Sequence, residues 1–518
     1  MNMEPIAFGV DFGTTNSIVC AWGTQIRQAL QNERPIALWD SQALGSVGKR
    51  PHPSVVWYPP GNQPVVGYEA KRRMLSTDGM GHAFVRSVKR RLGRDEEIEL
   101  TGGMRKPAFE VAAEIFRHLK ADAERHASLA QLGGQRGSLS ECVVTVPVNY
   151  NGKQRRDIRK AMERAGMRLR CFLHEPFAAL IGHFYHSETK LQQLCGNRVL
   201  VFDWGGGTLD ICLAEVSSDG SEIVELAHDG IEDRAGDDFD KKIMTDLKRR
   251  FLAKSGPPLE DVPVKGSAAD RFWSAAETAK IELSDARSAR VEIANFIEIY
   301  GKPIDLDEEL QREQFEELIR DEVIAAEACV QRCLHKARLT AGLVDHVLMV
   351  GGTSCIPAVR QMLEKTFGAR VAVAVEPDAA IARGAAIVAA ERWEPFNVKP
   401  IAVKLSDDTF FTVLPAKREL RPSASTGFTF YCTDPRPAVA NLMFYEQAVS
   451  GDAAYRALNA CLAVPSDPEI RAIANLDRIV ARFFITEDAT LCCEAQSSST
   501  KATRTCEIFD LSFGLKLR

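Results

Sequence analysis

The chain has 518 residues with 65 basic and 70 acidic side chains, so it is too long for one hydrophobic core and allows three or four domains. Its net charge of -5 predicts no nucleic-acid interface, and no apolar run is long enough to predict a membrane span. The 13 cysteines form no C-x-x-C pair, so we interpret most of them as small buried hydrophobic residues rather than disulfides or metal ligands.

The first motif is an apolar strand that ends in a carboxylate. Residues 8–17 place Asp11 after an apolar run and follow it with Gly13 and two threonines. Because this motif begins so close to the N-terminus, we expect no signal or transit peptide and a cytoplasmic location. Residues 54–58 and 65–68 then predict the short strands of a small β-rich insertion.

The following segments alternate between helix and strand. A basic cluster over residues 80–94, which contains Lys89, is typical of a solvated helix face. Alternation of this kind builds a layered α/β sheet. The apolar patterns predict a helix at 109–126, a strand at 142–147, a helix at 152–166, a strand at 169–173 and a helix at 177–186.

Residues 199–210 repeat the plan of the first motif. Asp203 ends an apolar strand, and three glycines at 205–207 and Thr208 follow it. Glycines let backbone N–H groups approach an anion, and the aspartate can hold a hydrated Mg²⁺. A glycine-rich hairpin with an incidental aspartate is the alternative for a single copy. Two copies predict a duplicated α/β lobe with a nucleotide between the halves.

Residues 238–338 become strongly helical. The patterns predict helices at 239–254 and 268–286 and one long amphipathic helix at 308–338, interrupted by a strand pair within 290–299. Residues 345–354 predict a strand and a third glycine turn, which opens a helix at 356–367 where a phosphate can bind. An alanine-rich helix at 378–392 closes this part of the chain.

Composition changes at residues 393–400, which we interpret as a linker. Beyond them a two-residue alternation replaces the helical pattern and predicts a small β-sandwich with a binding function. Its strands are predicted at 409–414, 427–432, 440–447, 479–485 and 490–495.

The three glycine turns, the two strand-ending aspartates and the Glu175-Pro176 step together resemble the heat shock protein 70 family, the DnaK-like chaperones. The resemblance covers residues 6–392 and, more faintly, 400–515. It implies an α/β fold with a duplicated actin-like (ribonuclease H-like) ATPase domain at 1–392, an interdomain linker at 393–400 and a β-sandwich substrate-binding-like domain at 401–518. It also implies that ATP or ADP binds with Mg²⁺ in the cleft.

The resemblance implies catalytic roles for five residues. Lys89 would place positive charge beside the γ-phosphate, which replaces the solvated-face interpretation for that residue. Glu175 would act near the metal and the attacking water, although a carboxylate at a helix N-terminus is the alternative. Thr208 would contact the γ-phosphate, and Asp11 and Asp203 would surround Mg²⁺ through water. The phosphates would be bound by Gly13, Thr14, Thr15, Asn16, Gly205, Gly206 and Gly207.

The same resemblance implies nucleoside contacts and a signalling pair. Glu277 and Lys280 match ribose-binding positions, although residues three apart on a helix can equally form a surface ion pair. Pro147 and Arg155 match the residues through which the family's ATPase signals to its peptide domain. The other implied nucleoside residues are Ser284 near adenine, Gly351 and Gly352 beside the ribose and phosphates, and Asp378 at the back of the pocket.

The chain departs from the family at three places. Ile281 and Cys355 stand where two arginines normally bracket adenine, which removes cation–π contacts of about 0.5 to 2 kcal/mol each and predicts weaker nucleotide binding. Cys171 replaces an arginine in the strand before Glu175, with Arg170 next to it, and the linker lacks the family's aliphatic run. These features weaken the expectation that a J-domain co-chaperone stimulates the protein.

The sequence therefore predicts an ATP-dependent, chaperone-like protein of the stress response that hydrolyses ATP and binds unfolded or extended polypeptide weakly. Weak binding follows because we expect no helical lid. A J-domain co-chaperone and a nucleotide exchange factor are the implied partners, with neither nucleic acid nor membrane. The alternative is a nucleotide-binding regulatory or co-chaperone module with little hydrolysis. A sugar kinase and a filament-forming relative are disfavoured by the helical segment and the sandwich.

Overall fold

A computed structural model describes residues 6–517 of the chain, with gaps inside that range. No helix in the described part is long and apolar enough to cross a membrane. The gaps are 31–33, 45–47, 62, 76–82, 101–102, 127–128, 130–138, 186–190, 255–263, 265–266, 300–301, 375, 433–437, 448–454 and 468–476.

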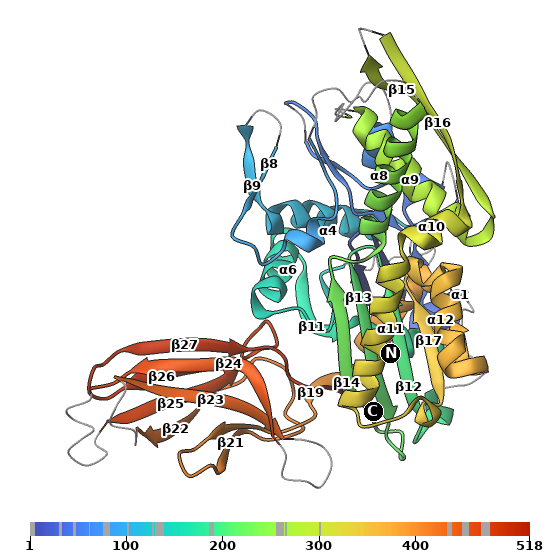
Figure 1. Cartoon of the computed structure of the whole chain (residues 1–518). Helices are drawn as coiled ribbons and strands as arrows, with labels where there is room; N and C mark the ends of the chain where they lie inside the picture. The colour runs from blue at the N-terminus through green and yellow to red at the C-terminus, as the bar shows by residue number, and fades with distance from the viewer. Residues whose placement is uncertain are drawn as a thin grey trace.

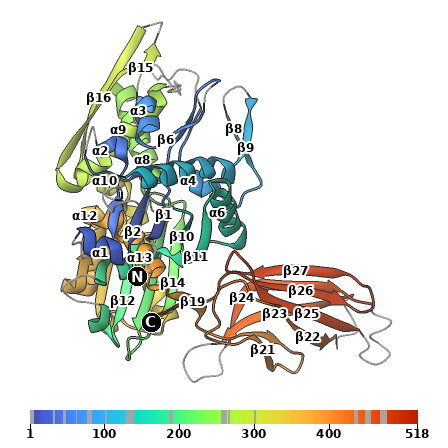
Figure 2. The ribbon, with the colours of Figure 1, turned by 180° about the vertical axis from the view of Figure 1, so that it is seen from behind.

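The first lobe, whose strand β11 is labelled in Figure 1 and whose strands β1, β2 and β10 are labelled in Figure 2, is built on a six-stranded sheet. The strand order is β11-β10-β1-β2-β3, with β4 beside β2. The first phosphate hairpin is the antiparallel pair of β1 (Ala7–Phe12) and β2 (Asn16–Trp22), which confirms the predicted strand and turn. The other strands of this sheet are β3 (Ile36–Leu38), β4 (His52–Pro53), β10 (Glu141–Val146) and β11 (Arg168–His174).

Helices and small sheets surround this first sheet. The predicted β-rich insertion is confirmed as a three-stranded sheet in the order β6-β5-β7. The surrounding elements are α1 (Thr24–Leu30), α2 (Ser41–Leu44), β5 (Val56–Tyr58), β6 (Val65–Val66), α3 (Tyr68–Leu75), β7 (Ala83–Val85), η1 (Val88–Arg91), β8 (Glu97–Glu99), β9 (Arg105–Pro107), α4 (Ala108–Arg125), α6 (Gly152–Arg164), α7 (Glu175–Phe184) and the 3-10 helix η3 (Leu191–Leu194).

The second lobe is built on a seven-stranded sheet with the order β18-β17-β12-β13-β14-β28-β19. The second phosphate hairpin is the antiparallel pair of β12 (Arg198–Trp204) and β13 (Thr208–Val216), in which Asp203 lies opposite Asp210. The other elements are β14 (Glu222–Glu232), α8 (Gly236–Lys254), α9 (Ser267–Asp285), η4 (Ala341–Leu343), β17 (His346–Val350), η5 (Gly352–Cys355), α12 (Pro357–Phe367), η6 (Gly368–Arg370), β18 (Val371–Val373) and α13 (Pro377–Glu391).

Two helices, α7 and α13, join the lobes below the cleft. They approach closely because each carries a glycine at the crossing: a Cβ on Gly182 would lie 1.9 Å from the Ala380 carbonyl oxygen, and one on Gly384 would lie 1.8 Å from that of Ala178. Any larger side chain at either position would push the helices apart. The glycines therefore set the spacing of the two phosphate hairpins.

The predicted long helix at 308–338 is wrong at its start and in its middle. Residues up to 311 form β16 (Lys302–Gln311), which pairs with β15 (Ser288–Ile299), so the predicted strand pair within 290–299 is one long strand. The alternation of buried Leu306, Glu308 and Leu310 explains the strand, because side chains in a strand alternate between its two faces. Two helices follow, α10 (Arg312–Leu318) and α11 (Arg320–Lys336).

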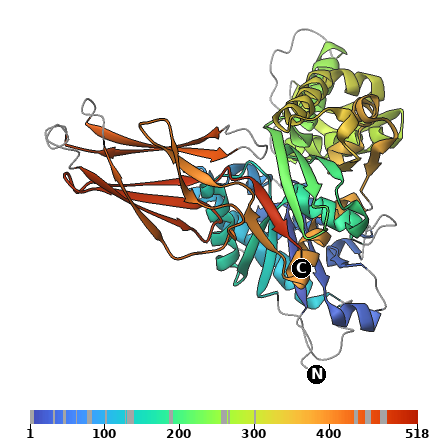
Figure 3. The ribbon, with the colours of Figure 1, turned by 90° about the horizontal axis from the view of Figure 1, so that it is seen from below.

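The C-terminal part contains two four-stranded antiparallel sheets, β21-β20-β23-β24 and β22-β25-β26-β27 (Figures 1 and 3). They meet through buried aromatic rings, among them Phe444 and Phe483, whose ring centroids lie 6.2 Å apart. The strands are β20 (Ile401–Lys404), β21 (Phe410–Leu414), β22 (Thr426–Tyr431), β23 (Val439–Gln447), β24 (Tyr455–Pro465), β25 (Arg478–Ile485), β26 (Leu491–Ser497) and β27 (Thr503–Ile508).

The chain then returns to the second lobe. The final strand, β28 (Phe513–Lys516), pairs with β14 on one side and with β19 (Glu394–Asn397) on the other. The predicted linker is thus partly a strand, and it reaches the lobe's sheet through β28. Figure 2 shows the C-terminus beside β14 and β19, away from the far end of the two C-terminal sheets. The domain boundaries at residues 392 and 401 stay a prediction. Residues 513–516, which were predicted in the β-sandwich domain, lie in the seven-stranded sheet.

Candidate functional site

The two phosphate hairpins face each other across a cleft and touch at their tips. A Cβ on Gly207 would lie 2.3 Å from Thr14 Oγ1, and one on Gly206 would lie 2.0 Å from Thr15 Oγ1. Glycine is therefore required where the second hairpin meets the threonines of the first. Most residues that line the cleft were predicted from the sequence: Asp11, Gly13, Thr14, Thr15, Asn16, Lys89, Glu175, Asp203, Gly205, Gly206, Gly207, Thr208, Gly351, Gly352 and Asp378. The lining residues that the sequence prediction missed are Ser17, Ile18, Pro51, Pro377 and Ile381.

A buried ion pair lies in this cleft. Lys89 Nζ donates to Glu175 Oε1 at 2.6 Å, and the two side chains are only 5% and 7% exposed. Lys89 lies on the 3-10 helix η1 and not on the predicted solvated helix face, while Glu175 begins α7. Burial alone would lower the pKa of Lys89, but Glu175, Tyr150 and Asp11 together outweigh burial and raise that pKa. Lys89 is therefore a fixed cation.

Three further carboxylates surround this pair. Burial, and then the charge of Glu175, raise the pKa of Asp11 and of Asp210 to about 7, and the same causes raise the pKa of Asp203 well above its ordinary value. So many acidic groups around one lysine repel one another in the absence of another cation. Carboxylate oxygens are also the ligands that Mg²⁺ prefers. The donor set fits a divalent cation held near Asp11 and Asp203.

The sequence prediction missed Asp210 and Asp237. Asp210 lies two residues beyond Thr208 on β13, and its Oδ1 accepts a hydrogen bond from the Val148 backbone at 3.2 Å. The two-residue alternation of a strand places Asp210 on the same face as Thr208, and this pattern could have predicted it from the sequence. Asp237, at the start of α8, accepts hydrogen bonds from the hydroxyls of Thr15 and Ser87 and so connects the second lobe to the first.

The third glycine turn supports the second hairpin. Gly351 has φ of +80°, and a Cβ there would lie 2.6 Å from Asp203 Oδ1, so this position favours glycine both for its backbone and for its surroundings. The Thr353 hydroxyl donates to the Gly205 carbonyl at 2.8 Å, and Ser354 Oγ accepts from the Trp204 backbone at 3.3 Å. The turn thereby holds Asp203 in place.

The predicted nucleoside residues on α9 lie beside the cleft but are not among its lining residues. Glu277 pairs with Lys71 at 2.8 Å, and Lys280 pairs with Asp240 at 2.7 Å and donates to the Gly236 carbonyl at 2.9 Å. Each therefore has a partner on another element instead of the alternative Glu277–Lys280 pair. Ser284 is half-buried on the same helix. Ile281 and Cys355, at the adenine positions, are both exposed.

Arg155, predicted as a signalling residue, contacts the C-terminal part directly. Its buried guanidinium donates to the Tyr150 carbonyl at 3.0 Å and to the Ala489 carbonyl at 3.3 Å, and it lies 3.4 Å from His174 Nε2. The carbonyl of Pro147 accepts a hydrogen bond from the Tyr150 backbone at 3.2 Å. Because Tyr150 also donates to the Lys89 carbonyl at 3.1 Å, a chain of contacts joins the cleft to the C-terminal sheets.

Two more contacts fix the C-terminal part against the first lobe. The Phe513 ring of β28 stacks on the ring of His174 with centroids 4.2 Å apart. His174 directly precedes Glu175 in the chain. The buried Asp488 accepts from Arg156 Nε at 3.1 Å and from Arg159 Nε at 2.8 Å, both on α6. The docked arrangement is therefore held by an aromatic stack and a charged cluster.

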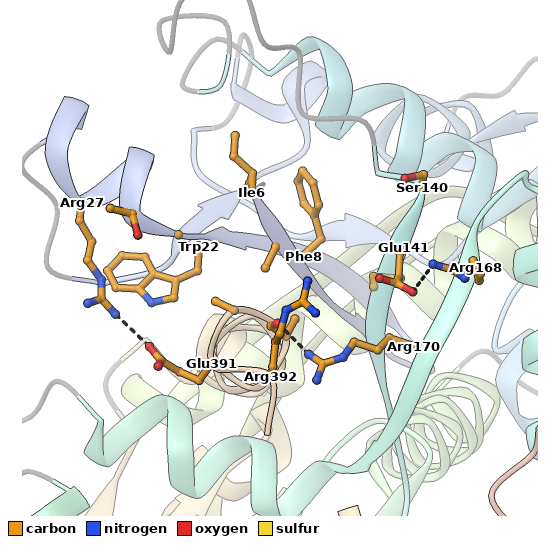
Figure 4. Close-up of a pocket in the computed structure, with 16 residues that line it drawn as sticks. Ile6, Phe8, Trp22, Arg27, Ser140, Glu141, Arg168, Arg170, Glu391 and Arg392 are labelled. Carbon is orange, nitrogen blue, oxygen red and sulfur yellow. Dashed lines mark hydrogen bonds and ion pairs between the residues drawn. The ribbon is translucent and has the colours of Figure 1, made fainter. Parts of the chain in front are cut away.

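A second cavity, of about 1000 Å³, lies at the base of the first lobe (Figure 4). Arg170 lines it and donates to the carbonyls of Val388 and Ala389 at 3.1 and 2.7 Å and to Glu394 at 3.0 Å. Arg170 thereby connects the end of α13 to the start of β19, beside the buried Cys171.

Comparisons with known proteins identify relatives of the chain. A family model described as Hsp70 protein matches residues 97–407. Among curated proteins, the chaperone protein DnaK of Thermotoga neapolitana is 32% identical over 384 residues, which are 74% of this chain and 59% of that protein. The DnaK proteins of Thermotoga petrophila and Thermotoga maritima are 31% identical over the same shares. The chain thus spans about three fifths of the length of these curated relatives.

Proposed function

The chain belongs to the Hsp70 protein family, whose members are ATPases, and from this premise we propose that it is an ATP-dependent chaperone that hydrolyses ATP in the cleft. The observation that carries the proposal is the buried Lys89–Glu175 pair beside the three carboxylates and the glycine turns. Together these groups supply a cation, carboxylates and backbone N–H groups that can bind a phosphate group. The α/β actin-like fold of the two lobes agrees with it.

Each residue of the cleft has a proposed task. Backbone N–H groups of the glycine turns bind phosphate oxygens, since the missing Cβ atoms let the backbone approach. Lys89 holds a positive charge where negative charge develops in the transition state, which is the dominant form of assistance in phosphoryl transfer. Glu175 fixes Lys89 and orients the attacking water. The Thr208 hydroxyl donates a hydrogen bond to the terminal phosphate.

Asp11 and Asp203 would hold Mg²⁺ through its waters, with Asp210 beside them. A bound Mg²⁺ would neutralise the phosphate oxygens and the carboxylates that otherwise repel each other. Asp378, whose pKa burial raises, closes the back of the pocket. Glu277 and Lys280 would give up their present ion pairs to bind the ribose. The adenine of ATP or ADP would lie among Ser284, Ile281 and Cys355.

We further propose that the two C-terminal sheets form a β-sandwich that binds extended polypeptide weakly. In the described strand order, β21 and β22 lie at sheet edges, and they carry the exposed Phe411 and Tyr431. An edge strand can pair with an extended chain through its backbone, and nearby aromatic rings can hold alternate side chains. The cytoplasmic location, the stress role, a J-domain partner and an exchange factor stay predictions from the resemblance.

The test is ATP hydrolysis with Mg²⁺ by the full chain and by two lysine variants. Lys89→Ala should lower the rate by about 100- to 1000-fold, the loss typical when one transition-state donor is removed. Lys153→Ala, at an exposed lysine, is the matched control and should retain the wild-type rate. Circular dichroism checks folding, since Glu175 loses its partner. Equal rates in the two variants would contradict the proposal.

A further inference from the structure

Three elements of the first lobe meet around a buried cluster of histidine and aspartate outside the nucleotide cleft. Asp40 precedes α2, His52 lies on β4, and His118 and Asp122 lie one turn apart on α4. One ligand atom from each of Asp40, His52 and His118 lies within 4.8 Å of the others. Helices α2, α3 and α4 are labelled in Figure 2.

Two ring nitrogens in this cluster are buried without a hydrogen bond. Among the described residues, His52 Nδ1 and His118 Nε2 have no hydrogen-bond partner, although a buried polar group normally has one. His52 is 1% exposed. His118 Nε2 lies 4.0 Å from Asp40 Oδ2, too far for a hydrogen bond and with both atoms turned toward the same space.

The remaining atoms of the cluster are arranged as supports. His52 Nε2 lies 3.0 Å from Asp122 Oδ2, and Asp122 also accepts from the Ser41 backbone at 3.0 Å. Metal-binding histidines typically donate their second ring N–H to a carboxylate in this way, which fixes the tautomer and the ring orientation. Asp40 Oδ2 accepts from the Tyr68 backbone at 3.0 Å and keeps further acceptor capacity.

We propose that Asp40, His52 and His118 bind one zinc ion, with Asp122 positioning His52. Imidazole and carboxylate ligands suit zinc, and three protein ligands leave one tetrahedral position for water. Zinc–ligand bonds of about 2.1 Å place tetrahedral ligands about 3.4 Å apart, so the cluster closes on the ion by shifts of under about 1 Å.

Charge and space both favour a cation here. Asp40 and Asp122 are both buried carboxylates, and buried charges in proteins are normally paired or bound to a metal. Gly67 leaves the adjoining space free, since a Cβ there would lie 2.7 Å from His118 Nε2 and 3.0 Å from Asp40 Oδ2.

The ion would fix α4 to the first phosphate hairpin. His52 lies opposite Ser17 in the β2–β4 ladder, and Ser54, two residues on, donates to the Gly13 carbonyl at 2.9 Å. Zinc would thus brace the loop that carries Gly13 and the two threonines without entering the cleft. The zinc site is distinct from the site of the Mg²⁺ proposed for the nucleotide.

The test measures zinc on the full chain. The purified protein is loaded with ZnCl₂, desalted and assayed by atomic emission, and its affinity is measured by competition with a chromophoric chelator. We expect about one zinc per chain. His118→Gln should lose a ligand and weaken binding by more than about 100-fold, and Asp122→Asn should weaken it by about 10- to 100-fold.

The control is His335→Gln, which removes an exposed histidine at the end of α11 and should leave stoichiometry and affinity unchanged. Co²⁺ replacement gives a second readout, because a tetrahedral site has a visible absorption that His118→Gln should abolish while circular dichroism stays native. Wild-type protein that retains no zinc, or zinc held equally by His118→Gln, would overturn the proposal.

Discussion

The C-terminal strand β28 depends on one aromatic side chain, and its removal should release the strand. Phe513 is 3% exposed, stacks on His174 and meets the Phe177 ring edge-on with centroids 4.9 Å apart. Truncating a buried phenylalanine to alanine costs about 3 to 5 kcal/mol. The only other large apolar side chain of β28 is Leu515, whose burial contributes about 1.5 to 3 kcal/mol. Phe513→Ala therefore removes most of the apolar free energy that docks β28.

Amide hydrogen exchange measures the release directly. Since each 1.4 kcal/mol is a factor of ten, the amides of Ile223, Glu394 and Phe396, which pair with β28, should exchange about 100- to 4000-fold faster in Phe513→Ala. Lys516→Ala, at the exposed position of the same strand, should change little. Unchanged protection in Phe513→Ala would refute the view that β28 joins the linker strand to the second lobe.

Three further predictions follow from the cleft and the docking surface. Restoring the adenine arginines by Ile281→Arg and Cys355→Arg should tighten ADP binding by about 2- to 30-fold each, measured by calorimetry, and unchanged affinity would refute the adenine placement. The pKa values of Asp11 and Asp210 are raised to about 7, so the folded state keeps protons there that the unfolded chain releases near pH 4. Without Mg²⁺ the contribution of these groups to stability should therefore fall as pH rises from 4 to 7, and Mg²⁺ should reduce that slope in thermal unfolding; an equal slope with Mg²⁺ would count against the metal site. Asp488→Ala leaves two arginines without their buried partner and should weaken docking by about 1 to 3 kcal/mol, seen as faster proteolysis between the two parts, whereas wild-type resistance would show that the charged cluster does not hold them.

The phosphate hairpins could be predicted from the sequence because their signal is local. An apolar run, one aspartate and adjacent glycines place Asp11 and Asp203 at strand ends, and β1 and β12 have those ends in the structure. The family resemblance added Lys89 and Glu175, which local patterns had assigned to a solvated face and to a helix start. Their 2.6 Å contact joins residues that are 86 positions apart in the sequence. Hydrophobic periodicity cannot predict a contact over such a separation.

Long-range pairing explains what the sequence did not reveal. β16 carries charged residues that also fit a helix, and only its pairing with β15 makes it a strand. β28 is four residues long and is defined by its neighbours β14 and β19. The contact of Arg155 with the Ala489 carbonyl likewise depends on how the C-terminal sheets dock. The histidine and aspartate cluster combines residues from three separate elements, so spacing in the chain gives no sign of it.

Single-turnover hydrolysis tests the central claim most directly. Excess protein is mixed with ATP and Mg²⁺, and the nucleotide is followed to completion in wild type, in Thr208→Ala and in the presence of EDTA. We predict that wild type converts all bound ATP to ADP and phosphate, that Thr208→Ala slows this by at least about tenfold, and that EDTA stops it. ATP that binds wild-type protein and remains intact would contradict the account.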